Sequence, residues 1–257
     1  MGQTASVKRG PLLVEPETSS AQVESQFLAG LSQKELNRLG PLLHREQLGM
    51  KHVVYQKNAP ILDVYFPIGA IISEVSVMED GNVIEVATTG REGMIGLPAF
   101  LGADSTVLSA FVQVPGEALR MSVADLRAET AKGGALSRLL LQFANAHLVQ
   151  VGQGAACNQL HSIRQRCARW LLMTHDRVGR DEFALTHEFM CQMLGVRRAT
   201  VSEIAAALQQ EGIIRNDRGR FTVLDRKALE VVTCECYWVI RREFQRMMKG
   251  LETVEKP

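Results

Sequence analysis

The residues best suited to direct chemistry lie between positions 185 and 224, where arginines and short polar side chains follow a helical spacing. Gly195 separates two short segments of helical apolar periodicity, and such an arrangement is typical of a helix-turn-helix. Thr186 is expected to cap the first helix, and the second helix is expected to span residues 197–210. Its inward positions are Val201, Ile204, Ala205 and Leu208, and its outward positions are Arg197, Arg198, Ala199, Ser202, Glu203 and Ala206.

The outward side chains have the donors and acceptors that DNA base edges require. Arg198 suits guanine O6 and N7, and Glu203 suits the amino group of cytosine. Arg197 and Thr200 suit phosphate or groove-edge contacts, which position a protein without reading sequence. The alternative is that the two arginines are solvated charges on an ordinary helical hairpin. The turn glycine, the spacing and the local basic charge favour DNA.

A β-hairpin is expected directly after this helix, at residues 213–224, with its turn at residues 216–219. A hairpin in this place is the wing of a winged helix-turn-helix. Arg218 and Arg220 near its tip are expected to contact phosphates, and each contact would steepen the log–log salt dependence of binding by about 0.9. The predicted DNA-binding residues are Thr186, Gln192, Arg197, Arg198, Ala199, Thr200, Ser202, Glu203, Arg218 and Arg220.

The charge of the 257-residue chain is unevenly distributed. Residues 1–150 carry 12 Lys and Arg against 15 Asp and Glu, a net charge of −3, whereas residues 151–257 carry 17 against 13, a net charge of +4. The total of +1 therefore does not exclude a nucleic-acid partner. No apolar run approaches the roughly 18 residues of a membrane helix, and no secretory signal is visible, so we expect a cytoplasmic protein with reduced thiols.

The sequence pattern from residue 42 to residue 121 predicts an antiparallel β domain, because short runs of β-branched and aromatic residues alternate with turns. Residues 1–24 are expected to be a flexible tail, and residues 26–39 a helix with a capping box of Ser32 and Glu35. Asp80-Gly81 is expected to be a hairpin turn. The expected strands include residues 53–55, 64–66, 71–75, 83–86, 111–114 and 118–121.

A long helix is expected at residues 131–158, with apolar side chains on two faces. One face can cover the β domain, and the other is most simply covered by the same helix of a second subunit. The alternative is a fully buried helix of a monomer. Gly152 and Gly154 are expected to bend or end this helix, and a further helix is expected over residues 160–178. The predicted dimer contacts are Leu136, Leu139, Leu140, Phe143 and His147.

This arrangement resembles the CRP/FNR family of bacterial transcription regulators over residues 26–250, most strongly at residues 191–202. Residues 64–67 and 90–96 are similar to the family's β-roll. The resemblance implies an α+β chain with an antiparallel β-roll (double-stranded β-helix) sensor domain at residues 25–130, a dimerisation helix at 131–158 and a winged helix-turn-helix at 159–250. It also implies a homodimer on a two-fold symmetric double-stranded DNA operator, with RNA polymerase as a further candidate partner and the effector left open.

The resemblance has consequences for individual residues. Arg198 matches the family's recognition arginine, but Ala199 and Glu203 stand where Glu and Arg are frequent, which implies a different operator. In members that bind cyclic AMP, an Arg beside Ser-Ala holds the phosphate and a Glu holds the ribose. Ser109 and Ala110 are present here, but the Arg position is Leu108 and residues 96–98 contain no acid. We therefore predict a sensor that does not bind cyclic nucleotides.

The five cysteines all lie in the second half of the chain, which excludes the N-terminal cluster of iron–sulfur members. Cys167 and Cys191 are expected to be core residues, on inward helix faces. Cys234-Glu235-Cys236 is not a zinc pattern by its spacing, and no second pair accompanies it, so neither a metal site nor another cofactor is predicted. A thiol redox switch stays open, whereas haem binding through His147 is less favoured than a packing role.

The predicted function is a sequence-specific DNA-binding transcription regulator that acts as a homodimer. No enzyme activity is predicted, because the sequence contains no Gly-rich phosphate loop, zinc pair or nucleophile motif. The alternative is a thiol-redox or small-ligand signalling module that acts through protein partners. The arginines of the predicted recognition helix and wing argue against that alternative.

Overall fold

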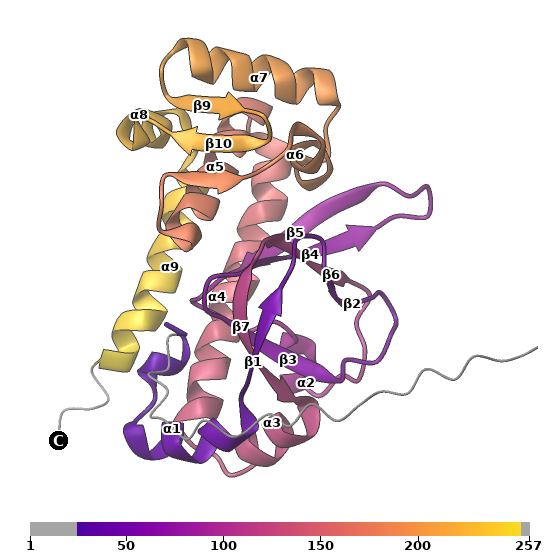
Figure 1. The fold of residues 1–257 in the computed structure, drawn as a ribbon, viewed down its shortest axis with the longest axis vertical. Helices are drawn as coiled ribbons and strands as arrows, with labels where there is room; N and C mark the ends of the chain where they lie inside the picture. Colours follow the sequence, from indigo (N-terminus) through magenta and orange to yellow (C-terminus); the bar gives the residue numbers. More distant parts are fainter. Residues whose placement is uncertain (1–24, 253–257) are drawn as a thin grey trace, which may run out of the picture.

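The computed structural model describes residues 25–252, so the predicted flexible tail at residues 1–24 lies outside the described part. A β-rich domain and a smaller helical domain are joined by one long helix, α4 (Ala135–Leu160) (Figure 1). Mixed helices and antiparallel sheets confirm the predicted α+β class. No helix in the described range is both long and apolar enough to cross a membrane.

The β-rich domain consists of two antiparallel sheets, with strand orders β1-β7-β3 and β2-β6-β4-β5. Six of the strands contain the six predicted runs, and Gly81 adopts φ 83° in the β4–β5 turn. The first strand was not predicted, because only Leu48 of its five residues is buried and its other side chains are polar. The strands are β1 (His44–Leu48), β2 (Val53–Tyr55), β3 (Asp63–Pro67), β4 (Ile71–Val77), β5 (Val83–Thr89), β6 (Ser109–Val114) and β7 (Gly116–Ser122).

The predicted helix at residues 26–39 is divided into a 3-10 turn, η1 (Leu28–Gly30), and a short helix, α1 (Gln33–Leu39). The chain is extended at Ser32, which caps α1 through the predicted capping box with Glu35. The 3-10 turn ends at Leu31 and α1 begins after Ser32, so one continuous helix was the wrong expectation. The remaining short elements of this domain are η2 (Gly40–Leu42), α2 (Leu97–Phe100) and α3 (Val123–Thr130).

Helix α4 continues through Gly152 and Gly154 to Leu160, so the expected end at these glycines is wrong. A glycine costs a helix about 1 kcal/mol relative to alanine, which burial of a long apolar face outweighs. Gly154 faces β5, where an added Cβ would lie 3.9 Å from the carbonyl oxygen of Val86, an ordinary van der Waals contact. The adjacent Gln150 donates a hydrogen bond of 3.1 Å to the carbonyl of Thr88.

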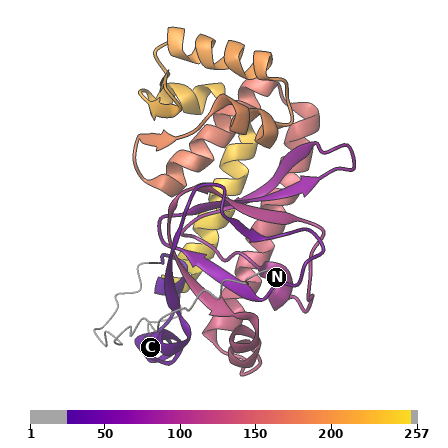
Figure 2. The same ribbon diagram turned by 45° about the vertical axis from the view of Figure 1, so that its right-hand side comes forward.

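The helical domain follows α4 and carries a small antiparallel sheet of order β8-β10-β9. The last helix, α9, returns from this domain beside α4 toward the β-rich domain, as both ribbon views show (Figures 1 and 2). Neither β8 nor α9 was predicted. The elements are α5 (Ile163–Val178), β8 (Glu182–Ala184), α6 (His187–Leu194), α7 (Arg198–Gln210), β9 (Ile214–Asp217), β10 (Arg220–Val223), α8 (Arg226–Val232) and α9 (Glu235–Glu252).

The residues predicted to form the dimer contact lie in the chain's own core. Leu136, Leu139, Leu140 and Phe143 are at most 1% exposed, and His147 lies 3.3 Å from the buried carboxylate of Glu74. They face the β-rich domain, so a second chain has no access to them. The helical periodicity of apolar residues predicted the buried face of α4 correctly, but it could not predict which part of the protein covers that face.

Buried polar contacts join the two domains. The indole N–H of Trp170 on α5 donates to Glu85 on β5 at 2.8 Å, and burial raises the pKa of that carboxyl group. Arg177 on α5 pairs with Glu92 at 2.7 Å. Because both ends of each contact are largely buried, separating the domains would leave polar groups without partners.

Gly93 provides a test of the contact between the β-rich domain and α4. An added Cβ would overlap the ring of Phe143 and lie 2.8 Å from Cγ2 of Thr89. We expect Gly93→Ala to lower the free energy of unfolding by about 1–3 kcal/mol, because the packed interface must shift. Gly49→Ala is the matched control, since no described atom lies within 4 Å of its Cβ position. Equal urea midpoints for the two variants would contradict this packing.

Candidate nucleic-acid interface

The helix-turn-helix forms from local signals that the sequence displays. The hydroxyl of Thr186 accepts a 3.1 Å hydrogen bond from the backbone N–H of Phe189 and so caps α6. Gly195 ends α6 in the left-handed conformation at φ 64°, which glycine adopts without steric cost. Arg197 is the extended residue before α7, so the second helix begins at Arg198, one residue later than expected.

Helix α7 lies at the outer edge of the helical domain, away from α4 (Figure 1). Val201, Ala205 and Leu208 are buried beneath it, while Ile204 is half-buried. Its first turn contains no acidic residue, so the positive end of the helix dipole and two guanidinium groups favour an anion there. Of the predicted set, Thr200 and Ser202 are half-buried, and the exposed members are Thr186, Gln192, Arg197, Arg198, Ala199, Glu203, Arg218 and Arg220.

A histidine that the sequence analysis did not assign connects the two helices to the wing. Nδ1 of His187 lies 3.2 Å from the hydroxyl of Ser202 on α7, and its Nε2 contacts the side-chain amide of Asn216 on β9. Burial, followed by the charge of Arg198, lowers the pKa of His187, which favours the neutral ring. Ser202 is therefore engaged within the protein, and its hydroxyl positions α7. Only the sequence position of His187 beside the cap of α6 hinted at this role.

The predicted wing is the hairpin of β9 and β10, in which Asp217 pairs with Arg220. Its two-residue turn consists of Arg218 and Gly219, with φ of 46° and 80°, the geometry that matches the twist of paired strands. Arg218 is 93% exposed at the tip, whereas Arg220 forms a 2.8 Å ion pair with Glu182 on β8. The two arginines are thus not equivalent, because only Arg220 has to exchange a close carboxylate partner to contact a phosphate.

The turn between α6 and α7 faces the β4–β5 hairpin of the β-rich domain. An added Cβ at Gly195 would lie 3.2 Å from Ile84 on β5, and Phe189 on α6 packs edge-on against Phe111 on β6 at 5.8 Å between ring centroids. Gln192, Arg197 and Thr200 line the groove between this hairpin and the turn. The predicted DNA contacts therefore divide into these groove residues and the open outer face of Arg198, Ala199 and Glu203.

Within residues 25–252, no grouping of metal ligands lies at this interface. Among the residues that the structure describes, one set of three or more His, Cys, Asp or Glu side chains has its ligand atoms close together, and it lies at the far end of α4: Cys157, His161, Cys234 and Cys236. Local spacing in the sequence does not predict this set, because Cys157 and Cys234 are 77 positions apart in the chain.

The sequence of residues 165–232 matches the family model of the Crp-like helix-turn-helix domain. The sequence has no match among the curated proteins. FixK2 from Bradyrhizobium japonicum has a similar structure, with a TM-score of 0.65 at 17% identity, covering 75% of this chain and 98% of that one. A crp/fnr-family transcriptional regulator from Eubacterium rectale has a TM-score of 0.63 at 15% identity, covering 80% and 96%.

A third similar structure is that of a CRP-family transcriptional regulator from Thermus thermophilus. It has a TM-score of 0.60 at 21% identity and covers 72% of this chain and 95% of that one. At these identities the structures establish the fold, and the family model establishes the nature of residues 165–232. Together they confirm the predicted resemblance in the fold: the chain has the fold of CRP/FNR-family regulators and carries a Crp-like helix-turn-helix domain at residues 165–232.

Proposed function

We propose that the protein acts as a homodimer that reads a specific, two-fold symmetric DNA site by inserting α7 into the major groove. The observation that carries this proposal is the open face at the start of α7, where Arg198, Ala199 and Glu203 are exposed at the outer edge of the domain. The protein would bind double-stranded DNA in the cytoplasm, with RNA polymerase as a candidate partner.

Each exposed side chain has a distinct role in the proposed complex. Arg198 donates to guanine O6 and N7, Glu203 accepts from a cytosine amino group, and the methyl group of Ala199 suits a thymine methyl. At the wing, Arg218 has no strong ion pair to break, since its nearest carboxylate lies 4.0 Å away on the adjacent residue. It therefore contributes to affinity through phosphate and not to sequence preference.

Two substitutions separate these roles. After selection of the preferred site from a random DNA library, Arg198→Ala should cost about 1–3 kcal/mol on that site and relax one base position. Arg218→Ala should weaken binding to all sequences alike and reduce the log–log salt slope by about 0.9. Fluorescence anisotropy across a salt series measures both. Arg246→Ala, an exposed arginine on α9, is the control, and unchanged affinity of Arg198→Ala would refute its base-reading role.

The proposed dimer contact is the exposed stripe of α4, on the side opposite its buried face. Leu141 and Leu148 are 59% and 68% exposed, although both are large apolar side chains. Gly152 and Ala155 continue the same side at spacings of four and three residues, and their small size permits close approach of a second helix. The spacing of seven residues from Leu141 to Leu148 to Ala155 is that of a coiled-coil seam.

Leu148→Asp should convert a wild-type dimer into a monomer, because the charge would lie unpaired in an apolar contact. Light scattering after size-exclusion chromatography gives the mass of each species. Leu62→Asp is the matched control, since Leu62 is 73% exposed on the β-rich domain away from α4. A dimer that persists in Leu148→Asp would show that another surface joins the subunits.

We also propose that the sensor domain does not bind cyclic nucleotides. Leu108 offers no charge to a phosphate, and the hydroxyl of Ser109 already accepts a 2.9 Å hydrogen bond from the backbone N–H of Lys57. Pro98, in the first turn of α2, removes one backbone donor from that short helix. An anionic phosphate at this position would lose hydration without gaining a charged partner.

Isothermal titration calorimetry with cyclic AMP and cyclic GMP should therefore show no saturable heat. Leu108→Arg supplies the missing guanidinium, and a gain of affinity in this variant alone would identify the position as the limiting one. Micromolar or tighter binding by the wild-type protein would overturn the proposal.

The alternative of a thiol-redox signalling module finds less support. Burial raises the pKa of Cys167 to about 12 and raises that of Cys191, so neither thiol favours the reactive thiolate.

A further inference from the structure

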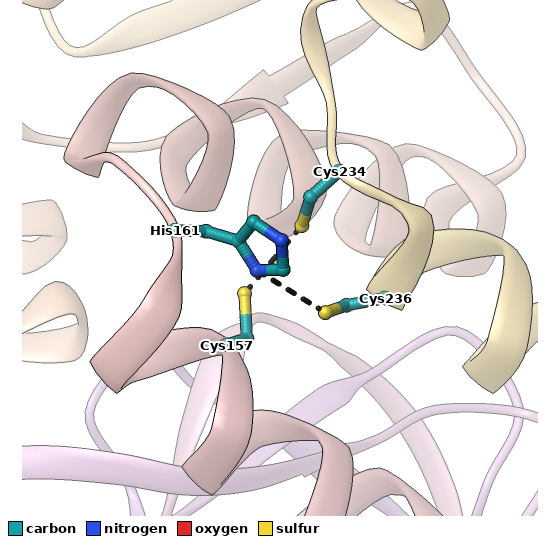
Figure 3. A group of neighbouring side chains, drawn as sticks. All are labelled: Cys157, His161, Cys234 and Cys236. Atoms are coloured by element: carbon teal, nitrogen blue, oxygen red, sulfur yellow. Dashed lines mark hydrogen bonds between the residues drawn. The ribbon is translucent and has the colours of Figure 1, made fainter.

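Four potential metal ligands converge where α4 ends and α9 begins (Figure 3). Cys157 and His161 are four residues apart at the end of α4, and Cys234 and Cys236 flank the first residue of α9. Their ligand atoms all lie within 4.8 Å of one another. The Sγ atoms of Cys157 and Cys234 are 3.5 Å apart, and Sγ of Cys236 is 3.5 Å from Nδ1 of His161.

The donor set and its dimensions fit a tetrahedral ion. Zinc–sulfur bonds of about 2.3 Å place the sulfur atoms of a tetrahedral site about 3.7 Å apart, close to the separation of 3.5 Å between Cys157 and Cys234. Three thiolates and one imidazole are a common structural zinc set, and soft sulfur ligands disfavour magnesium or calcium. All four positions come from the protein, which leaves no coordination position for a substrate.

The surroundings orient the ligands as a metal site requires. Nε2 of His161 lies 3.1 Å from the carboxylate of Glu235, which leaves Nδ1 facing the sulfur atoms. The side-chain amide of Gln153 donates to Sγ of Cys236 at 3.2 Å. A carboxylate on the outer nitrogen of a ligating histidine and an N–H group on a ligating sulfur are partners that commonly orient metal ligands.

The local charge also points to an anionic complex. Arg166 and Arg169 on α5 are only 8% and 9% exposed, and Arg166 donates a hydrogen bond of 3.1 Å to the side-chain oxygen of Asn158, the residue after Cys157. Among the described residues, Nε of Arg169 is buried without a hydrogen-bond partner. Three thiolates around one divalent ion carry a net charge of −1, which would offset this buried positive charge.

We propose that Cys157, His161, Cys234 and Cys236 bind one Zn²⁺ ion in a structural site. Binding replaces three thiol protons, which pass to solvent, and changes no oxidation state. His161 is the C-cap residue of α4, and the next residue, Ser162, is the N-cap of α5. The ion would therefore hold the joint between the two domains to the start of α9.

The first experiment uses the full-length wild-type chain, purified under reducing conditions without chelator. Inductively coupled plasma mass spectrometry should find about one zinc per chain. Replacement by Co²⁺ should give a thiolate-to-cobalt charge-transfer band and intense visible bands of tetrahedral cobalt. Absence of both zinc and a cobalt spectrum would overturn the proposal. So would a metal-free protein in which peptide mapping finds a Cys157–Cys234 disulfide.

Variants then test the individual roles, with zinc affinity measured by competition with a chromogenic chelator. Glu235→Gln retains all four ligands and changes a side chain that is 72% exposed, so the fold should be unaffected while zinc binds about 10–100-fold more weakly. Cys236→Ser should lose most of the bound zinc. Cys191→Ser, outside the cluster, is the control and should keep it.

Chelation provides a readout that is independent of the ligand variants. Strong chelator should lower the Tm of the wild-type protein and of Cys191→Ser, because the ion binds the folded state. The Tm of Cys236→Ser should not respond. Equal zinc affinity in all of these variants would exclude the cluster as the site.

Discussion

The packing of α4 against its neighbours is the constraint on which the rest of the structure depends. Its 26 residues span about 39 Å, so one rigid element connects the β-rich domain to the DNA-binding domain. Phe143 lies at the centre of this contact, with its ring 5.6 Å from that of Phe27 and 6.4 Å from that of Phe244 on α9. Residues from the beginning, middle and end of the described chain thus meet on one side chain of α4.

Polar contacts across the same region limit how the domains can move. Glu74 accepts from Tyr55 at 2.6 Å and faces His147 on α4, while Glu85 faces Trp170 on α5. Buried carboxylates are costly without partners, so a change in the β4–β5 sheet has to be accompanied by a change in the helices that satisfy them. The hairpin of the same two strands also faces the turn before α7. This continuity gives the β-rich domain a physical route to α7.

The accuracy of the sequence predictions follows the range of the interactions involved. Thr186, Gly195 and the apolar spacing of residues 201, 205 and 208 act within one or two helical turns, so the helix-turn-helix was predicted almost to the residue. The strands that contain β-branched runs were also predicted from the sequence. Helix α9 was missed although its buried residues Tyr237, Ile240, Phe244 and Met247 recur at the helical spacing of three and four that the sequence displays. The polar strand β1 was missed because its pairing with β7 supplies stability that local pattern does not display. The role of His187 was missed for the same reason.

The sequence by itself determined the type of each strongly patterned element, the caps and turns that bound it, and the exposed residues of the recognition helix, because these depend on neighbours a few positions away. Only the tertiary structure decided which face of α4 is covered, since helical periodicity shows an apolar stripe without naming its neighbour. It also brought Cys157 within 3.5 Å of Cys234, 77 positions along the chain. Spacing rules for metal ligands apply within a local motif, whereas this cluster arises because α9 folds back along α4.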